Sequence, residues 1–311
     1  MIITHSSLEC FKCCRRKYQY RYLDKICPKE ASNALQFGTE MHEILAQLFE
    51  GIEAEQAREN AEIEPIESVR DRLCAMIDIA NLEPTDRAKL KGLTIGYLNK
   101  WYLSDCREYE VIDVEKEFSH EAEYHYKDCE PHVFFVGKVD GILKRKSDGK
   151  YFILEHKTAS IVDESYVAQK EIDSQTMTYA ACIQDVMGIE ISGAIHDIIT
   201  KQKIRLKKGE TEEGFCQRLI DDVTDDNFTR IIIEFEPYEL RDFTKELNEA
   251  VDDAVYCRNF YKCTGSCIGR YGACEYLPLC KAKGKLEGLE ELYEVRKAHE
   301  EISDETLEGV G

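Results

Sequence analysis

The chain has 311 residues, of which 43% are hydrophobic and 33% charged, a composition typical of a soluble globular protein and not of a disordered one. No apolar run approaches the ~20 residues that cross a membrane, and the opening segment Met1–His5 lacks the basic-then-apolar plan of a signal peptide. We therefore expect a cytoplasmic protein without a membrane partner. The formal net charge of −20 argues mildly against a nucleic-acid partner, although net charge describes the whole surface and not one cleft.

The first third of the chain is predicted to be mainly helical. Residues 6–24 are expected to form a helix capped by one of its opening serines, with aromatic residues following at helical spacing. A second helix covers residues 36–50, and residues 53–105 continue with helical patterns that prolines interrupt.

Strands and helices alternate along the rest of the chain. Runs of β-branched and aromatic residues predict strands at 111–118, 133–143, 150–157, 194–200 and 230–235. Helices are expected at 164–187 and 239–261, and residues 282–311 are expected to form a charged, solvated helix. This order is that of an α/β protein with a central mixed β-sheet flanked by helices.

Fourteen cysteines are many for a cytosolic chain, where disulfides are rare and grouped cysteines indicate metal binding first. Nine of them lie near the two ends, within residues 10–27 and 257–280. A metal site is therefore expected from these two groups. The other five are scattered and are expected to pack as small hydrophobic residues, namely Cys74, Cys106, Cys129, Cys182 and Cys216.

Charged residues flank a predicted hairpin in the middle of the chain. Asp148-Gly149 between two strands is a strong two-residue turn signal. Such a turn pairs Asp140 with Lys157 and makes Glu155 the diagonal neighbour of Asp140 on the same face of the sheet. A bulge in either strand would shift this register, so the geometry is a hypothesis.

These three side chains suit metal-dependent cleavage of a phosphodiester. Two carboxylates are hard ligands for Mg²⁺ or Mn²⁺, and such an ion lowers the pKa of a bound water and neutralises charge on the phosphate. A lysine beside the ion orients or deprotonates that water and stabilises the transition state. The spacing alone is permissive, however, and solvent-facing carboxylates with an ion-paired lysine would explain it as well.

Two longer runs of residues resemble a known family. Gly137–Gly141 and Ile153–Thr158 resemble motifs II and III of the PD-(D/E)XK nuclease superfamily, and most closely its RecB-like branch, which includes CRISPR-associated and phage exonucleases. The resemblance implies that Asp140 and Glu155 hold the metal and that Lys157 is catalytic. It also implies a restriction-endonuclease-like core.

Further positions match this branch in the same order. His42 matches the histidine of its G-x-x-x-H motif, which is an additional metal ligand, and Gln175 and Tyr179 match its catalytic Q-x-x-x-Y motif. Gln175 and Tyr179 are one helical turn apart, so both polar groups can reach one phosphate or the lysine, although a half-buried amphipathic helix would show the same spacing. An acidic position of the branch fits Glu115 or Glu117, and both stay open.

The cysteines near the ends resemble those of iron–sulfur members of the branch. Cys14 resembles the opening cysteine, although Arg15 stands where those members usually have proline. Cys267, Cys274 and Cys280 resemble the distal triplet, with C-x6-C in place of the usual first C-x2-C spacing. The resemblance implies a [4Fe–4S] cluster that joins the N- and C-terminal segments.

Zinc is the other metal that four thiolates would suit. Zinc sites generally show two short cysteine pairs, and the proposed set has neither, so an iron–sulfur cluster is favoured. Within the set, Cys13 competes with Cys14, and Cys263 competes with Cys267.

The negatively charged phosphates of a DNA substrate would bind to basic residues. The candidates for DNA contact are Arg15, Arg16, Lys17, Lys201, Lys203 and Arg205, each of which could equally belong to a solvated face. No Walker-type motif is present, so a helicase or recombination protein would be a separate partner.

The sequence thus predicts a single nuclease domain over residues 1–311. Its expected parts are an N-terminal helix (1–30), a helical insertion (46–105), a catalytic core (106–262), a cysteine-rich segment (263–281) and a charged tail (282–311). The predicted activity is that of an exonuclease on single-stranded DNA or DNA ends in recombination, repair or phage replication. The alternatives are a CRISPR-adaptation nuclease that trims spacer precursors and a non-catalytic iron–sulfur subunit that binds DNA.

Overall fold

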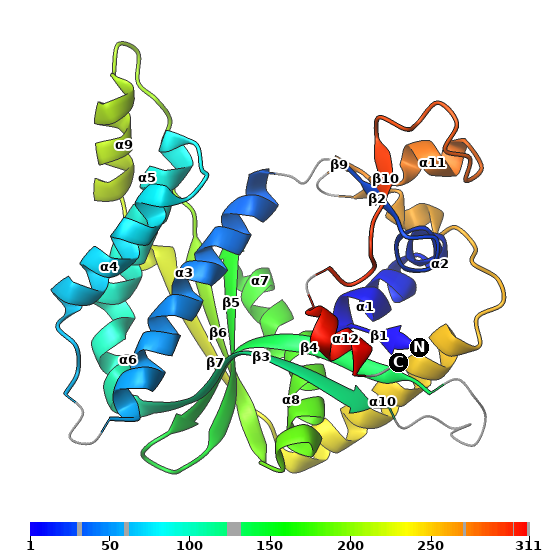
Figure 1. Ribbon diagram of the computed structural model, residues 1–311, viewed down its shortest axis with the longest axis horizontal. Coiled ribbons are helices and arrows are strands. Elements are labelled where there is room, and N and C mark those ends of the chain that lie inside the picture. Colours follow the sequence, from blue (N-terminus) through cyan, green and yellow to red (C-terminus); the bar gives the residue numbers. More distant parts are fainter. Residues whose placement is uncertain (30–32, 59–61, 123–131, 270–271, 301, 310–311) are drawn as a thin grey trace. The chain divides into compact units, whose positions relative to one another are not determined.

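The computed structural model describes residues 1–29, 33–58, 62–122, 132–269, 272–300 and 302–309 (Figure 1). The chain divides into two compact units, and both are discontinuous in sequence. The first unit comprises residues 1–32, 117–138 and 238–311, and the second comprises residues 33–116 and 139–237. Each unit is described by itself below.

A mixed sheet forms the centre of the second unit, as the sequence predicts. The second half of β4 (Phe134–Arg145) pairs antiparallel with β5 (Tyr151–Ala159), which runs parallel to β6 (Ile191–Thr200). The sheet ends at β7 (Phe228–Glu234), antiparallel to β6, and β3 (Tyr109–Glu121) also pairs with β4. The α/β class is thereby confirmed.

Helices cover both faces of this sheet (Figure 1). The helices of one face are α3 (Asn33–Gln56), α4 (Ile66–Ile79), α5 (Pro84–Tyr97), the π-helical η2 (Leu98–Tyr102) and α6 (Leu103–Glu108). They bury one apolar core with alternate residues of β5 and β6, such as Leu154 and Ile195. The opposite face is covered by α8 (Ser174–Met187), which packs against β5 and β6.

The helices of the second unit differ from the prediction in two ways. The helix expected over residues 164–187 is two helices, because α7 (Glu164–Glu171) ends before Asp173, whose side chain caps α8. Helix α9 (Glu212–Asp221), which packs against α5, was not predicted.

The predicted register of the central hairpin is wrong by two residues. Gly141 pairs with Leu154 and not with His156, and the pairing of β4 with β5 runs from there to Lys144 and Tyr151. Because strand side chains alternate faces with period two, an error of two residues keeps each paired residue on its predicted face. Asp140 itself contacts His42 of α3 and the ring of His156.

The connection between β4 and β5 explains this error. Arg145 donates its backbone N–H to Lys150 O, and Gly149 donates its own to Arg145 O. The loop is therefore longer than a two-residue turn. Gly149 has a φ of 74°, a conformation that favours glycine.

The first unit begins with a broken helix where a continuous one was predicted. Helix α1 (His5–Cys13) is capped by Thr4 in a capping box with Ser7, and not by a serine. Cys14 is extended, with a φ of −159°, and separates α1 from α2 (Arg15–Tyr18) and the π-helical η1 (Gln19–Leu23). The expected helix over 6–24 is therefore wrong at Cys14.

The remaining elements of the first unit are mostly short. Strand β1 (Ile2–Ile3) pairs with the start of β4, β2 (Ile26–Pro28) pairs with β10 (Tyr293–Val295), and β8 (Ile268–Gly269) pairs with β9 (Gly272–Ala273). The helices are α10 (Pro237–Val255), α11 (Leu277–Lys281) and α12 (Asp304–Glu308). The described part of residues 282–311 thus holds a strand and one short helix, and the prediction of a charged helical tail is wrong there.

In the part of the chain that the structure describes, no helix is both long enough and apolar enough to cross a membrane.

Candidate active site

Asp140 and His42 meet in the second unit, although they are far apart in sequence. His42 lies on α3, whose apolar side is buried in the core, and its Nδ1 is 3.2 Å from Asp140 Oδ1. The backbone N–H of His156 donates to the other carboxylate oxygen, Asp140 Oδ2, at 2.6 Å. The structure therefore brings together two of the predicted metal ligands.

Glu155 and Lys157 complete the predicted set on β5. They are two residues apart in one strand and thus lie on the same face, where Lys157 Nζ forms an ion pair with the Glu155 carboxylate. Glu155 is 2% exposed, whereas the Lys157 side chain is 30% exposed. The carboxylate is thus buried beneath a lysine that reaches the surface.

Electrostatics couple the two carboxylates. Burial, and then the negative charge of Asp140, raise the pKa of Glu155 to about 7. Burial would also raise the pKa of Asp140, but contacts with His156 and His42 outweigh it and hold that pKa well below its usual range. Two coupled like charges, one buried and one half-buried, call for a proton or a cation to neutralise them.

Neighbouring carboxylates raise the pKa values of Lys157 and His42 and thus favour their charged forms. Burial acts to lower the pKa of Lys157, but the Glu155 carboxylate outweighs it and raises that pKa. The pKa of His42 is raised in the same way, because Asp140 outweighs the effect of burial. Lys157 is therefore a cation in this arrangement.

Gln175 and Tyr179 lie on α8, the helix that covers the Glu155 face of the sheet. Gln175 Nε2 donates to the Tyr179 hydroxyl at 3.1 Å. At the start of the same helix, Asp173 forms an ion pair with Lys170 and contributes to the electrostatic environment of Lys157. The predicted pair therefore lies together at the N-terminal part of α8.

Sequence reasoning missed several buried polar groups around this set. His196 on β6 pairs in register with Glu155, is completely buried, and has no hydrogen-bond partner for either ring nitrogen among the described residues. Burial lowers the pKa of His196 to about 4, so the ring is neutral at pH 7. His156 and Asp197 are buried on the opposite face. In the sequence, these groups could have been found as polar residues within the otherwise apolar strands β5 and β6.

The two acidic candidates on β3 have different surroundings. Glu117 belongs to the first unit, where its carboxylate accepts the backbone N–H of Ser303 at 3.0 Å and the Thr306 hydroxyl at 2.6 Å, at the start of α12. Glu115 belongs to the second unit and has a φ of 51°, which is unusual for a residue with a side chain. A role for either in the site stays a prediction.

Six of the nine cysteines near the chain ends line one pocket of the first unit. This pocket, of about 310 Å³, contains all four predicted ligands and both competitors, namely Cys13, Cys14, Cys263, Cys267, Cys274 and Cys280. The backbone N–H of Cys263 donates to Cys14 Sγ at 3.4 Å. Cys274 donates its backbone N–H to Cys267 O at 2.8 Å.

The other cysteines lie elsewhere. Cys106 and Cys182 are buried as small hydrophobic residues, Cys74 and Cys216 are half-buried, and Cys129 lies outside the described residues. Among the described residues, no three His, Cys, Asp or Glu side chains already stand in an arrangement that could hold a metal ion.

The basic residues of the N-terminal segment are engaged within the first unit. Arg15 stacks on Phe11 and Tyr261, with 5.0 Å from the guanidinium carbon to each ring centroid. Arg16 Nε donates to a backbone carbonyl at 2.7 Å, and Lys17 forms an ion pair with an acidic side chain at 3.0 Å. These contacts compete with any role in DNA contact.

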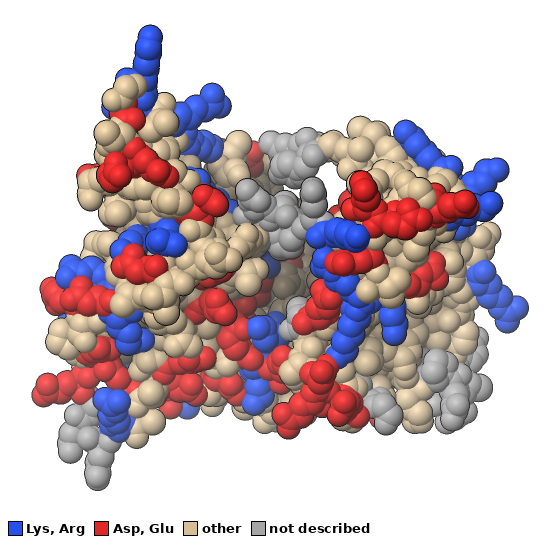
Figure 2. All heavy atoms as spheres, turned by 45° about the horizontal axis from the view of Figure 1, so that its top comes forward, with Lys and Arg blue, Asp and Glu red and all other residues tan. Residues whose placement is uncertain are grey.

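The basic residues after β6 are more exposed. Lys203 and Arg205 are exposed, whereas Lys201 is half-buried, with its Nζ 4.3 Å from the ring centroid of Phe37 on α3. Figure 2 shows basic side chains at the outer end of this segment, above α9 at the upper left. Over the rest of the visible face, acidic and basic side chains are interspersed among other residues.

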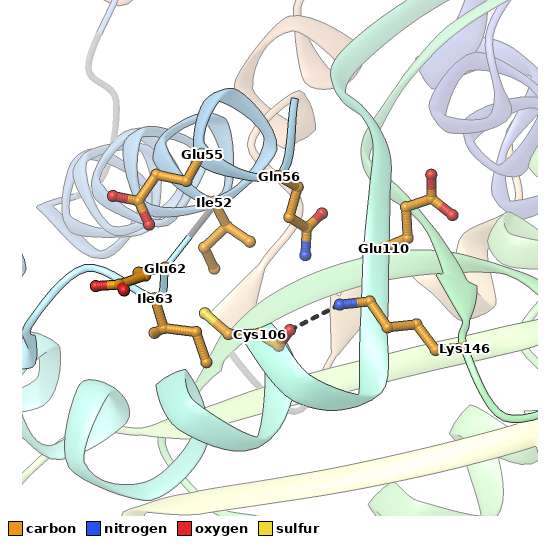
Figure 3. Close-up of a pocket in the computed structure, with 8 residues that line it drawn as sticks. All are labelled: Ile52, Glu55, Gln56, Glu62, Ile63, Cys106, Glu110 and Lys146. Atoms are coloured by element: carbon orange, nitrogen blue, oxygen red, sulfur yellow. Dashed lines mark hydrogen bonds between the residues drawn. The ribbon is translucent and has the colours of Figure 1, made fainter. Parts of the chain in front are cut away.

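A separate pocket of about 410 Å³ lies in the second unit (Figure 3). Its lining includes Glu55, Glu62 and Glu110, together with Lys146, whose Nζ donates to Cys106 O at 2.9 Å. None of the predicted catalytic residues lines it. It therefore does not belong to the candidate site.

Residues 2–281 match the PD-(D/E)XK nuclease superfamily, and the chain belongs to that superfamily. The match covers Asp140, Glu155 and Lys157. Members of the superfamily are typically phosphodiesterases that use divalent metal ions. No curated protein matches the chain.

Proposed function

We propose that this protein is a metal-dependent deoxyribonuclease in which Asp140, Glu155 and Lys157 cleave the phosphodiester bond. The observation that carries the proposal is that the buried Glu155 carboxylate pairs with Lys157 and is coupled electrostatically to the half-buried carboxylate of Asp140. An isolated ion pair of Glu155 with Lys157 would not need the second carboxylate, Asp140, beside it. Membership in the nuclease superfamily supports the same conclusion.

The donor set suits a hard divalent cation. Asp140 and Glu155 offer carboxylate oxygens, and His42 offers a ring nitrogen beside Asp140. Their mutual repulsion, expressed in the raised pKa of Glu155, would be relieved by a positive ion. Mg²⁺ or Mn²⁺ bound there would supply Lewis-acid stabilisation of phosphate charge and a more acidic water.

The remaining roles fall to the side chains themselves. Lys157 is protonated and half-exposed, so it would orient the attacking water and stabilise negative charge that develops on the phosphate. Gln175 and Tyr179 share a hydrogen bond on the helix beside β5, and would fix one phosphate oxygen relative to Lys157.

The resemblance of the motifs to the RecB-like branch favours an exonuclease that acts on single-stranded DNA or DNA ends. Such an enzyme would act in recombination, repair or phage replication. The exposed basic residues Lys203 and Arg205 would contact the backbone of the strand, with Lys201 beside them. A helicase or recombination protein would be a separate partner.

An iron–sulfur cluster is the second part of the proposal. Cys14, Cys267, Cys274 and Cys280 would hold a [4Fe–4S] cluster, and the shared pocket of about 310 Å³ supports it. Because two lysines, Lys17 and Lys262, also line the pocket, the negative charge of a thiolate-bound cluster would be partly compensated. The cluster would join the two ends of the chain within the first unit.

The experiment is digestion of end-labelled DNA by protein purified without oxygen. Single- and double-stranded DNA, labelled at the 5′ or the 3′ end, would be incubated with Mn²⁺ or with EDTA. We expect Mn²⁺-dependent release of short products from one end of single-stranded DNA. No cleavage with any divalent cation, or cleavage that EDTA does not inhibit, would contradict the proposal and favour a non-catalytic DNA-binding subunit.

A further inference from the structure

A row of buried polar side chains crosses the sheet of the second unit behind Asp140. His156 on β5 is in register with Asp197 on β6, and Asp197 is in register with Arg230 on β7. Paired residues of neighbouring strands point to the same face. The side chains of His156, Asp197 and Arg230 are 3%, 1% and 8% exposed. Ionisable groups buried to this degree are costly unless each one is paired.

The far end of the row is fully paired. Arg230 donates to both oxygens of Asp197, at 2.6 and 2.7 Å, and to both oxygens of Asp105, at 2.5 and 3.0 Å. The Tyr97 hydroxyl donates to Asp197 Oδ2 at 2.5 Å, and Trp101 stacks on the guanidinium at 4.3 Å. Two bidentate carboxylates fix a guanidinium in one plane. Asp197 is therefore held in a single orientation.

The near end of the row reaches the candidate metal ligand. The ring Nδ1 of His156 lies 3.6 Å from Asp140 Oδ2, the oxygen that already accepts the His156 backbone N–H. The ring Nε2 lies 4.0 Å from Asp197 Oδ2 and has no hydrogen-bond partner among the described residues. Phe49 and Tyr97 pack on the same ring, with centroid separations of 5.5 and 6.2 Å. The imidazole thus stands between two carboxylates within an aromatic surround.

We infer that His156 is a positioning residue, which holds the Asp140 carboxylate in the orientation that a divalent cation requires and which lies against the Oδ2 oxygen of Asp197 on its other side. The inference rests on the proposed metal site. A group behind a metal ligand fixes the direction of its lone pairs, and loss of such a group typically weakens metal binding by about ten- to a hundredfold. His156 acts through Asp140 and not on the substrate.

Mn²⁺ binding, followed by electron paramagnetic resonance of the free ion, tests the inference without any activity measurement. His156→Asn keeps a donor near the Nδ1 position and removes Nε2, whereas His156→Gln does the reverse. We expect each variant to raise the Mn²⁺ dissociation constant by about tenfold or more. Asp105→Asn is the matched control, because it disturbs the same network at the end farthest from Asp140. We expect it to lower the free energy of unfolding and to leave the Mn²⁺ dissociation constant unchanged.

Three results would overturn the inference. Folded His156 variants with the wild-type Mn²⁺ dissociation constant would refute it and leave the metal site intact. An equal loss of Mn²⁺ affinity in Asp105→Asn would assign the effect to general destabilisation. A wild-type protein that binds no Mn²⁺ would refute the proposed function as well.

A milder variant serves if neither His156 substitution folds. Tyr97→Phe removes only the hydroxyl that holds Asp197, and we again expect weaker Mn²⁺ binding, so an unchanged dissociation constant would refute the inference.

Discussion

Glu155 is the residue of the site whose ionisation is most unfavourable. Its carboxylate is 2% exposed, and burial together with the charge of Asp140 raises its pKa to about 7. At neutral pH Glu155 is therefore divided between its protonated form and the carboxylate that pairs with Lys157, and only the carboxylate can bind a metal ion. Proton and metal compete for the same oxygens, which links metal binding to pH.

This competition predicts a pH-dependent stability in the absence of divalent ions. The folded-state pKa of Glu155 lies above its ordinary value of 4.5, so the stability it contributes is complete below that value and is lost as the pH rises through about 7. We expect the wild type to lose stability relative to Glu155→Gln as the pH increases from about 5 to about 7. Denaturant unfolding in EDTA measures the difference.

Subtracting the free energies of unfolding of the two proteins cancels the contributions of the other titrating groups. His196, whose pKa is lowered to about 4 by burial, contributes with the opposite sign in a similar range, and it is present in both proteins. The lowered pKa of Asp140 acts only at more acidic pH. A constant difference between wild type and Glu155→Gln from pH 5 to pH 7 would contradict the assignment to Glu155.

The residues at the site were predictable to different degrees. Asp140 and Glu155 lie in a short stretch of chain, so a local pattern was enough to bring them into one hairpin, although the predicted register was wrong by two residues. The contacts of His156 were not predictable, because Asp197 and Arg230 lie on strands distant in sequence. Their neighbourhood depends on strand order and register, which no local pattern contains.

At the scale of elements, local backbone chemistry decided where prediction failed. Helical spacing continues through residues 6–24, but Cys14 is extended and interrupts the helix. Asp173 caps a new helix inside a span whose apolar pattern predicts one helix. In both cases the pattern of apolar residues was right about helix and wrong about continuity.

Gly193 on β6 is required by the close approach of β7. A Cβ added there would lie 2.0 Å from Ile233 O, a backbone atom that cannot move without breaking the strand pairing. We expect Gly193→Ala to lower the free energy of unfolding by about 1–3 kcal/mol or more. Thermal and denaturant unfolding would measure the loss.

Gly51 on α3 provides the matched control in the same unit. A Cβ added at Gly51 would meet only the guanidinium of Arg72, at 2.9 Å, which is the mobile end of a long side chain. Because alanine is the better helix former, Gly51→Ala should be neutral or stabilising by up to about 1 kcal/mol. Equal losses in both variants would show that the β6–β7 approach is not the cause.

At the scale of the whole molecule, the two proposed metal centres belong to different units. His42, Asp140 and Glu155 lie in the second unit, and the cysteine pocket lies in the first. The sequence indicated both groups of residues, but it did not indicate this division, because each unit is assembled from segments far apart in the chain. The net charge of −20 likewise gave no indication of the exposed basic segment after β6.

The division predicts that the two centres can be lost separately. We expect Cys274→Ser to abolish the visible absorption of a protein purified without oxygen and to lower the melting temperature of the first unit. Mn²⁺ binding by the second unit should persist. Cys216→Ser, a half-buried cysteine outside the pocket, should keep the absorption. A colourless wild-type protein would contradict the iron–sulfur part of the account and leave the nuclease part standing.

Single-turnover cleavage of labelled single-stranded DNA with Mn²⁺, compared between the wild type and Lys157→Ala, tests the central claim most directly. We predict that the wild type cleaves and that the variant, while binding Mn²⁺ normally, is slower by about 10²–10⁴-fold. Cleavage by Lys157→Ala at the wild-type rate would contradict the claim, because the chemistry would then not depend on the lysine beside the two carboxylates.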